Sequence, residues 1–331
     1  MSNTILSVLD LALINQGETT QQALEAAADL AVYLEQLKYK RIWFAEHHNS
    51  ISIASSATAL VIGYVAGKTT SIRVGAGGIM LPNHSPLVVA EQFGTLGIIY
   101  PNRIDLGLGR APGTDQTTAF ALRRQNMNAH FNFKSEVKEL QKYFSKDNRL
   151  ANVRAIPAEG VDVPIWILGS STDSAYLAAE LGLPYAFAAH FAPGQLYNAV
   201  KIYKREFKPS DVLAKPYVTV AVNVIAADTQ EEATQLAKSQ QMMFLNVVTG
   251  QQKLLQPPTE LPELYYRPDV NRVVESMLAC TFKGTKETLK PQLSNFIEEL
   301  GVDELIVASA IYDKQAKKKS FSIFKEVMDS L

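Results

Sequence analysis

Short apolar runs rich in β-branched residues alternate along the chain with longer stretches in which apolar residues recur at helical spacing. The stretch 20–38, for example, carries Ala27, Ala31 and Leu34 on one helical face. The predicted strands are residues 5–9, 41–45, 72–81, 103–108, 163–168, 185–189, 217–225 and 304–308. The predicted helices are residues 20–38, 54–67, 86–100, 173–181, 192–207, 230–248 and 314–328, with a broken helical region between 114 and 144.

Strands that alternate with helices of this length are typical of parallel βαβ units. A set of eight such strands favours a closed barrel over an open sheet. The sequence therefore predicts an α/β fold, a (β/α)8 TIM barrel in a single domain over residues 1–331. An open Rossmann-like sheet is the structural alternative.

Two segments interrupt this alternation. Residues 251–269 contain four prolines and the pair Tyr265 and Tyr266, so they are not expected to form regular helix. We expect an insertion or lid over residues 249–283, between the seventh and eighth predicted strands, because long insertions in barrels belong to the loops that follow strands. The mostly polar segment 146–159 is expected to be a loop or a hairpin.

Composition limits the binding partners and the cellular compartment that we expect for the protein. The 331 residues carry a formal net charge of −1, so no overall field favours nucleic acid or an anionic membrane. Cys280 is the only cysteine, which excludes an intrachain disulfide, and we interpret it as a small buried hydrophobe. The beginning of the chain does not resemble a signal peptide, and no apolar run has the roughly 18 residues of a membrane helix. We expect a cytoplasmic protein.

Candidate functional residues follow the predicted strands, at the barrel end where active sites lie. They include Glu46, His47 and His48 after the second strand, His84 after the third and His190 after the sixth. Glycines cluster at the same end; these clusters are residues 75–78, 107–113 and 169–174.

The run Gly169-Ser170-Ser171-Thr172-Asp173-Ser174 has the character of an anion site. Small residues allow close approach to the backbone, hydroxyls donate hydrogen bonds, and a helix N-terminus follows. Simple capping of the helix by one hydroxyl residue is the alternative. Arg110 closes the fourth strand among glycines and suits bidentate binding of a phosphate, or else an ion pair with a carboxylate such as Asp115.

The pair His47-His48 indicates proton transfer near neutral pH. We expect no metal site, because adjacent residues on a strand point to opposite faces and would not converge on one ion. No Walker A run, no Gly-x-Gly-x-x-Gly opening a first helix and no Gly-x-Ser-x-Gly elbow is present, so Rossmann-type NAD binding is not expected.

Several of these runs resemble the bacterial-luciferase-like flavin monooxygenases. The runs are Trp43-Phe44-Ala45-Glu46-His47-His48, Ile79-Met80-Leu81-Pro82-Asn83-His84-Ser85-Pro86, Asn102-Arg103-Ile104-Asp105-Leu106-Gly107-Leu108-Gly109-Arg110 and Gly169-Ser170-Ser171. The similarity extends over nearly the whole chain, with the proline-rich segment least constrained. It implies the luciferase-like TIM barrel and an enzyme that uses a flavin.

The resemblance also implies roles for individual residues. It implies that Arg110, Ser171 and Ser174 contact the phosphate of FMN, with backbone contacts from Gly169 and Ser170. It implies that His47 lies beside the flavin ring and transfers protons. It implies a non-proline cis peptide against the flavin at Gly77-Gly78. His84 departs from the family pattern by one position, so no role is implied for it, and His48 and His190 are likewise left without one.

The implied reaction is monooxygenation of an apolar organic substrate, such as an aldehyde or a ketone, with O₂ and reduced FMN from a separate flavin reductase. Phe191, Tyr265 and Tyr266 are expected to exclude water. A reaction with the deazaflavin F420, or flavin binding without catalysis, remains open. The resemblance further implies a homodimer through the second and third helices, with small residues such as Ala57 and Ala59 on the former and Glu91 on the latter.

Overall fold

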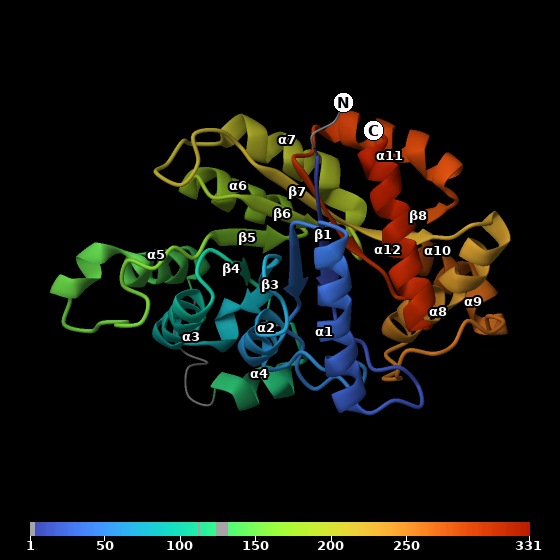
Figure 1. Cartoon of the computed structure of the whole chain (residues 1–331), viewed down its shortest axis with the longest axis horizontal. Helices are drawn as coiled ribbons and strands as arrows, with labels where there is room; N and C mark the ends of the chain where they lie inside the picture. The colour runs from blue at the N-terminus through green and yellow to red at the C-terminus, as the bar shows by residue number, and fades with distance from the viewer. Residues whose placement is uncertain (1–3, 112, 124–131) are drawn as a thin grey trace.

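The computed structural model describes residues 4–111, 113–123 and 132–331, and its centre is one parallel sheet (Figure 1). The strands are β1 (Ile5–Asp10), β2 (Arg41–Phe44), β3 (Arg73–Met80), β4 (Ile104–Gly109), β5 (Ile165–Gly169), β6 (Tyr185–Ala188), β7 (Val218–Ala226), β8 (Thr281–Gly284) and β9 (Glu304–Ala308). They are ordered β6-β5-β4-β3-β2-β1-β9-β7-β8, and pairing of β6 with β7 closes a barrel of eight strands. The expected (β/α)8 barrel is confirmed, and the open Rossmann-like sheet is wrong.

One strand, β8, lies outside the closed ring of eight. It pairs with the C-terminal half of β7, while the N-terminal half of β7 pairs with β6 and β9. β7 reaches all three neighbours because it has 9 residues. The sequence pattern did not predict β8, because a strand of 4 residues that includes Lys283 is too short to show a clear alternation.

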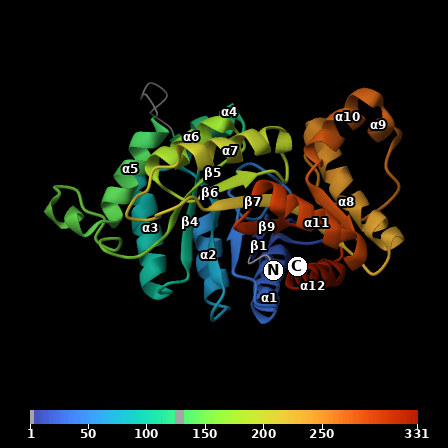
Figure 2. The same ribbon diagram turned by 90° about the horizontal axis from the view of Figure 1, so that it is seen from above.

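Helices surround the barrel (Figures 1 and 2). They are α1 (Thr20–Gln36), α2 (Thr58–Ala66), α3 (Pro86–Ile99), α4 (Gln116–Arg123), α5 (Phe133–Phe144), α6 (Thr172–Leu181), α7 (Leu196–Glu206), α8 (Gln230–Val248), α9 (Glu263–Tyr266), α10 (Pro268–Met277), α11 (Lys286–Leu300) and α12 (Lys314–Asp329). Three 3₁₀ turns join them: η1 (Leu81–Asn83), η2 (Lys146–Leu150) and η3 (Pro193–Gln195). α1 shows the local logic: Thr19 and Gln22 form a capping box at its start, and its buried face includes Ala27 and Leu34.

The barrel interior is filled at its N-terminal end. Arg41 lies there between two buried carboxylates, with Nη1 2.8 Å from Asp105 Oδ2 and Nε 2.8 Å from Glu304 Oε1. Above this ion-pair network Trp43 and Trp166 pack edge to face, with ring centroids 5.1 Å apart. Because charged and aromatic side chains occupy this end, a ligand has to enter at the opposite end, where the strands terminate.

Several predicted elements differ from the structure, although α8 has the predicted bounds. The sequence did not predict α11, because Pro291 inside this helix interrupts the helical pattern. Residues 251–269 do contain regular helix: α9 lies within them, and Pro268 starts α10 at the first helical position, where no backbone N–H is needed. The segment 146–159 forms η2 and turns. The region 114–144 contains α4 and α5, and residues 124–131 between them lie outside the described residues.

Part of the segment expected to be an insertion packs with α8 in a small hydrophobic core separate from the main one. α8, α9 and α10 lie together on one side of the barrel in both views (Figures 1 and 2). Tyr265 is buried among Met242, Leu245 and Val274 in this group.

Cys280, just before β8, is only half-buried, and burial raises the pKa of its thiol to about 11. No helix in the described parts of the chain is long and apolar enough to cross a membrane.

Candidate active site at the barrel mouth

The residues that the sequence singled out lie at the C-terminal ends of neighbouring strands. His47 follows β2, Gly77 and Gly78 lie within β3, Arg110 follows β4, and Gly169 ends β5. β2, β3, β4 and β5 are consecutive neighbours in the sheet, so these positions share one sector of the barrel mouth. Pro112 in the adjoining loop lies outside the described residues.

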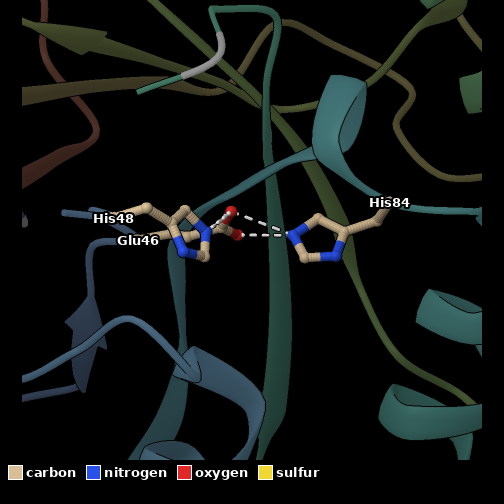
Figure 3. A group of neighbouring side chains, drawn as sticks. All are labelled: Glu46, His48 and His84. Carbon is tan, nitrogen blue, oxygen red and sulfur yellow. Dashed lines mark hydrogen bonds and ion pairs between the residues drawn. The ribbon is translucent and has the colours of Figure 1, made fainter. Parts of the chain in front are cut away.

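Glu46 is the buried carboxylate of this sector, with 1% of its side chain exposed (Figure 3). Its Oε1 accepts hydrogen bonds from His48 Nε2 at 2.8 Å and from His84 Nε2 at 2.9 Å. Its Oε2 accepts one from the backbone N–H of Met80 at 3.1 Å. Burial acts to raise the pKa of Glu46, but the hydrogen bonds from His84, His48 and Met80 outweigh it, so the pKa lies below its usual value. Glu46 therefore stays ionised.

His47 points away from this cluster. Its ring contacts the backbone of Gly113, and its own backbone N–H donates to Ser55 O at 3.4 Å. Burial lowers the pKa of His47, and contacts with Gly113 and Glu46 oppose that shift without cancelling it. The ring is thus neutral near pH 7 and has one nitrogen to offer a ligand. His48, in contrast, is held by Glu46.

A second neutral imidazole, His190, lies near His47. Burial lowers its pKa to about 4, and His47 contributes to that shift. Its Nδ1 is buried and has no hydrogen-bond partner among the described residues. Phe191 packs edge to face on the ring, with centroids 4.9 Å apart, and Asn223 Nδ2 donates to the His190 carbonyl at 2.5 Å. In the sequence, only the position of His190 after a predicted strand pointed to the site, and no role could be predicted from it.

Gly77 and Gly78 form a floor against which a flat ligand can lie. The peptide bond between them is cis, as the resemblance implied. A Cβ on Gly78 would lie 2.4 Å from Leu168 Cδ1 and 2.7 Å from Gly107 O, so no other residue type fits there. The carbonyl of Gly78 also accepts the backbone N–H of Glu46 at 3.3 Å, which ties this floor to the carboxylate cluster.

The run Gly169–Ser174 forms the junction between β5 and α6. Ser171 is the N-cap residue of α6, but its side chain makes no capping hydrogen bond, so the simple capping alternative is not realised by that hydroxyl. Ser174 has a different role: its Oγ donates to Ser171 O at 2.7 Å and lies 3.0 Å from Tyr185 Oη. A Cβ on Gly169 would lie 2.1 Å from Ser174 Oγ, so Gly169 is needed for that packing.

Arg110 reaches the same junction. Its Nη2 lies 3.2 Å from Asp173 Oδ2 in the first turn of α6, and 53% of the Arg110 side chain and 68% of the Asp173 side chain are exposed. An ion pair this exposed contributes little stability, so the guanidinium is free to contact another anion. The alternative partner, Asp115, binds Thr118 and Asn49 instead.

The residues expected to exclude water are dispersed. Tyr265 is a core residue of the α8–α10 group, where Gln241 Nε2 donates to its hydroxyl at 2.8 Å. Tyr266 is exposed, and Phe191 is partly exposed beside His190. Of the three, Phe191 is the one that the structure brings to a histidine of the barrel mouth.

The family model described as luciferase-like monooxygenase matches residues 6–304. This chain belongs to the luciferase-like monooxygenase family. It is 50% identical over 326 residues to the protein YvbT of Bacillus subtilis (strain 168), covering 98% of this chain and 97% of that protein. It is 45% identical over 325 residues to a luciferase-like monooxygenase of Escherichia coli (strain K12), covering 98% and 97% of the two chains. It is 32% identical to the N-acetyl-S-alkylcysteine monooxygenase of Bacillus subtilis (strain 168), with 98% of each covered.

Several solved structures share this barrel. The crystal structure of apo-MsnO8 superposes with a TM-score of 0.90 at 30% identity and covers 98% of both chains. At a TM-score of 0.71 and 17% identity, the oxygenating constituent of 3,6-diketocamphane monooxygenase from Pseudomonas putida, in complex with FMN, covers 98% of this chain and 97% of its own. An F420-dependent secondary alcohol dehydrogenase has the same TM-score at 16% identity and covers 100% and 99%. At these lower identities the likeness concerns the fold alone.

Proposed function

We propose that this luciferase-like family member is a flavin-dependent monooxygenase that uses reduced FMN and O₂ to oxidise a small apolar organic substrate. The observation that carries the proposal is the junction at which Arg110 meets the N-terminus of α6. A guanidinium and a helix N-terminus whose N-cap side chain makes no capping hydrogen bond together form an anion site, and one anion that both suit is the terminal phosphate of FMN.

The residues of this junction fit a phosphate. The Arg110 guanidinium would supply two parallel donors, and the Ser171 hydroxyl, which caps nothing, would supply a third. Gly169 and Ser170 would contribute backbone contacts. Ser174 would position Ser171, because its hydroxyl already donates a hydrogen bond to the Ser171 carbonyl. Thr172 N–H is engaged by Gln195 Oε1 at 3.0 Å and is therefore not counted among the donors.

The flavin ring would lie toward the floor formed by Gly77 and Gly78. Reduced flavin supplies the two electrons with which one oxygen atom of O₂ becomes water while the other enters the substrate. The protein would bind and orient the ring, and Phe191 beside His190 would help to exclude water. One ring nitrogen of His47 contacts Gly113. The lowered pKa of His47 keeps the other nitrogen unprotonated near pH 7, so that nitrogen can accept a proton.

An apolar substrate suits the interior beneath the mouth. Leu9, Ala308 and Leu168 belong to the hydrophobic cluster inside the barrel, and Leu168 packs against the glycine floor. Aldehydes and ketones are therefore the substrates we propose. A thioether belongs in the same test, because one relative at 32% identity is an N-acetyl-S-alkylcysteine monooxygenase. We further propose that a separate reductase supplies the reduced FMN.

Oxygen uptake tests the proposal. The protein is mixed with photochemically reduced FMN and a panel of aldehydes, ketones and thioethers under oxygen-18-labelled O₂, and products are analysed by mass spectrometry. One labelled oxygen in an organic product is the expected result. Release of hydrogen peroxide alone across the panel would point to flavin binding without catalysis. Reduction of a ketone by reduced F420, with no response to FMN, would replace the proposal by the deazaflavin reaction.

A further inference from the structure

Three metal-binding side chains meet at one point of the barrel mouth. Glu46 and His48 come from the segment after β2, and His84 comes from the segment after η1 (Figure 3). One ligand atom from each, a carboxylate oxygen and two imidazole nitrogens, lie within 4.8 Å of one another. We propose that Glu46, His48 and His84 bind a divalent transition metal ion of the zinc type. This inference does not depend on the proposed flavin chemistry.

The distances fit an ion after side-chain shifts within the cluster. His48 Nε2 and His84 Nε2 lie 2.8 and 2.9 Å from Glu46 Oε1. Zinc binds nitrogen and carboxylate oxygen at about 2.0–2.2 Å, so two ligands of a tetrahedral ion are about 3.3 Å apart. Each nitrogen–oxygen separation has to open by about half an ångström, and the two imidazole nitrogens, which lie within 4.8 Å of each other, have to come within about 3.3 Å.

The chain positions explain why three ligands converge. Glu46 and His48 are two residues apart in the irregular segment after β2, and the bend at His48 leaves both side chains at one point. The intervening His47 points the other way, toward Gly113, and is not a ligand. Parallel pairing of β2 with β3 then brings His84 to the same end of the barrel. The sequence expectation of no metal site rested on the adjacent histidines and on the lack of a carboxylate–histidine spacing elsewhere, and it did not place His84 beside Glu46.

The surroundings of the carboxylate are those of an oriented metal ligand. The backbone N–H of Met80 donates to Oε2 at 3.1 Å, and Asn83 Nδ2 lies 3.3 Å from Oε1. Such outer contacts fix a ligating carboxylate and raise metal affinity. Glu46 has 1% of its side chain exposed, whereas His84 has 27%, so the ion reaches the site from the side of His84, where solvent completes its coordination.

The donor set decides the class of metal. Two imidazoles and one carboxylate favour zinc, cobalt, nickel or copper over magnesium and calcium, which prefer oxygen ligands only. One carboxylate charge with two neutral rings offsets half of the charge of a divalent ion. The bound ion would join the segment after β2 to the segment after η1, which are now linked by the hydrogen bonds of Glu46 alone within this cluster.

Cobalt provides a test with a direct spectroscopic readout. The tag-free full-length protein is treated with chelator, dialysed and titrated with Co²⁺, whose visible absorption reports coordination by nitrogen ligands. We expect saturation at one ion per chain, displacement by Zn²⁺ and no displacement by Mg²⁺. His84→Ala and His48→Ala should each weaken binding at least tenfold. His190→Gln removes an imidazole outside the cluster and should bind as the wild type does.

Thermal unfolding supplies a second readout. Zn²⁺ should raise the Tm of the wild type and leave that of His84→Ala unchanged. His84 is partly exposed, so this variant is expected to fold, and circular dichroism checks that it does. If His84→Ala does not fold, the milder His84→Gln replaces it. Absence of saturable Co²⁺ and Zn²⁺ binding below millimolar concentration overturns the proposal, as does binding that both histidine variants leave unchanged.

Discussion

At the scale of single residues, the four histidines of the barrel mouth lie in two kinds of environment. His48 and His84 are fixed by the ionised carboxylate of Glu46, whereas His47 and His190 are kept neutral by burial. Two neutral imidazoles at the mouth of a barrel can each donate one hydrogen bond and accept another near pH 7. The separation rests on which rings meet the carboxylate, since the four side chains are chemically identical.

Arg110 offers a direct test of the anion site. Arg110→Ala should raise the Kd for FMN at least tenfold, because a charge-assisted bidentate contact is worth about 1.5–3 kcal/mol. Its affinity for riboflavin, which lacks the phosphate, should not change. Arg154→Ala is the matched control, since Arg154 is also partly exposed but pairs with Glu159 away from the mouth. Flavin fluorescence titration measures both constants. An FMN affinity equal to that of the wild type would show that Arg110 does not bind the phosphate.

His190 gives the stability of the protein a dependence on pH. Its pKa is about 4 in the folded chain and 6.5 in the unfolded chain, so below pH 6.5 the unfolded state binds the proton first. Stability should therefore fall as the pH drops from 6.5 toward 4, by about 2 kcal/mol at pH 5 from this residue.

His190→Gln should remove that part of the pH dependence. Urea unfolding at pH 7 and pH 5 gives the two free energies for each protein. The difference between pH 7 and pH 5 should be smaller in the variant than in the wild type. Equal differences in the two proteins would mean that His190 is not buried as a neutral ring.

At the scale of elements, β3 is the strand on which the site depends. It pairs with β2 and β4, carries the glycine floor, and leads into η1 and His84. Its register against β4 shifts between Gly77 and Ile79. Small residues are needed here because the backbones of β3 and β4 and the side chain of Leu168 approach closely at Gly78.

Gly78→Ala should be strongly destabilising. The added methyl would lie 2.7 Å from Gly107 O, and a backbone atom cannot rotate away as a side chain can. Overpacking of this kind costs about 1–3 kcal/mol. Gly194→Ala is the control, because nothing lies within 4 Å of the position its Cβ would take. Urea unfolding should show a large loss for the first variant and a change within about 0.5 kcal/mol for the second. Similar stabilities for both variants would refute the close packing.

At the scale of the whole molecule, apolar side chains are exposed on two adjacent helices. On α2, Leu60 is 76% exposed, and on α3 the values are 59% for Ile98 and 57% for Ile99. α2 and α3 pack against each other, so these side chains lie on neighbouring elements. Exposed apolar side chains on adjacent helices are found at protein interfaces. We propose that a second copy of the chain binds here, as the sequence resemblance implied.

Leu60→Asp should shift the protein from dimer to monomer, because it places a charge in the proposed interface. Sedimentation velocity at micromolar concentration measures the change. Val212→Asp is the control: Val212 is 53% exposed, but it lies in the loop between α7 and β7. If the wild type is already monomeric, or if both variants remain dimers, α2 and α3 do not form the interface.

Local sequence patterns were sufficient for the barrel itself. The alternation of apolar strands and amphipathic helices predicted all eight closing strands, because each βαβ unit is a local structure whose periodicity is visible in about thirty residues. The same patterns placed His47, Arg110 and the Gly169–Ser174 run at strand ends. The cis peptide at Gly77-Gly78 followed from family resemblance and is present in the structure.

Only the tertiary structure decided which of these residues meet. The sequence left Arg110 open between a phosphate and a carboxylate such as Asp115, and it assigned no partner to His84. The fold places Asp173 beside Arg110 and brings His84 to Glu46 across 38 positions of the chain. It also uses the hydroxyl of Ser174 internally, which the sequence could not show. Such contacts depend on strand pairing and side-chain direction between distant segments, and a local pattern carries no information about either.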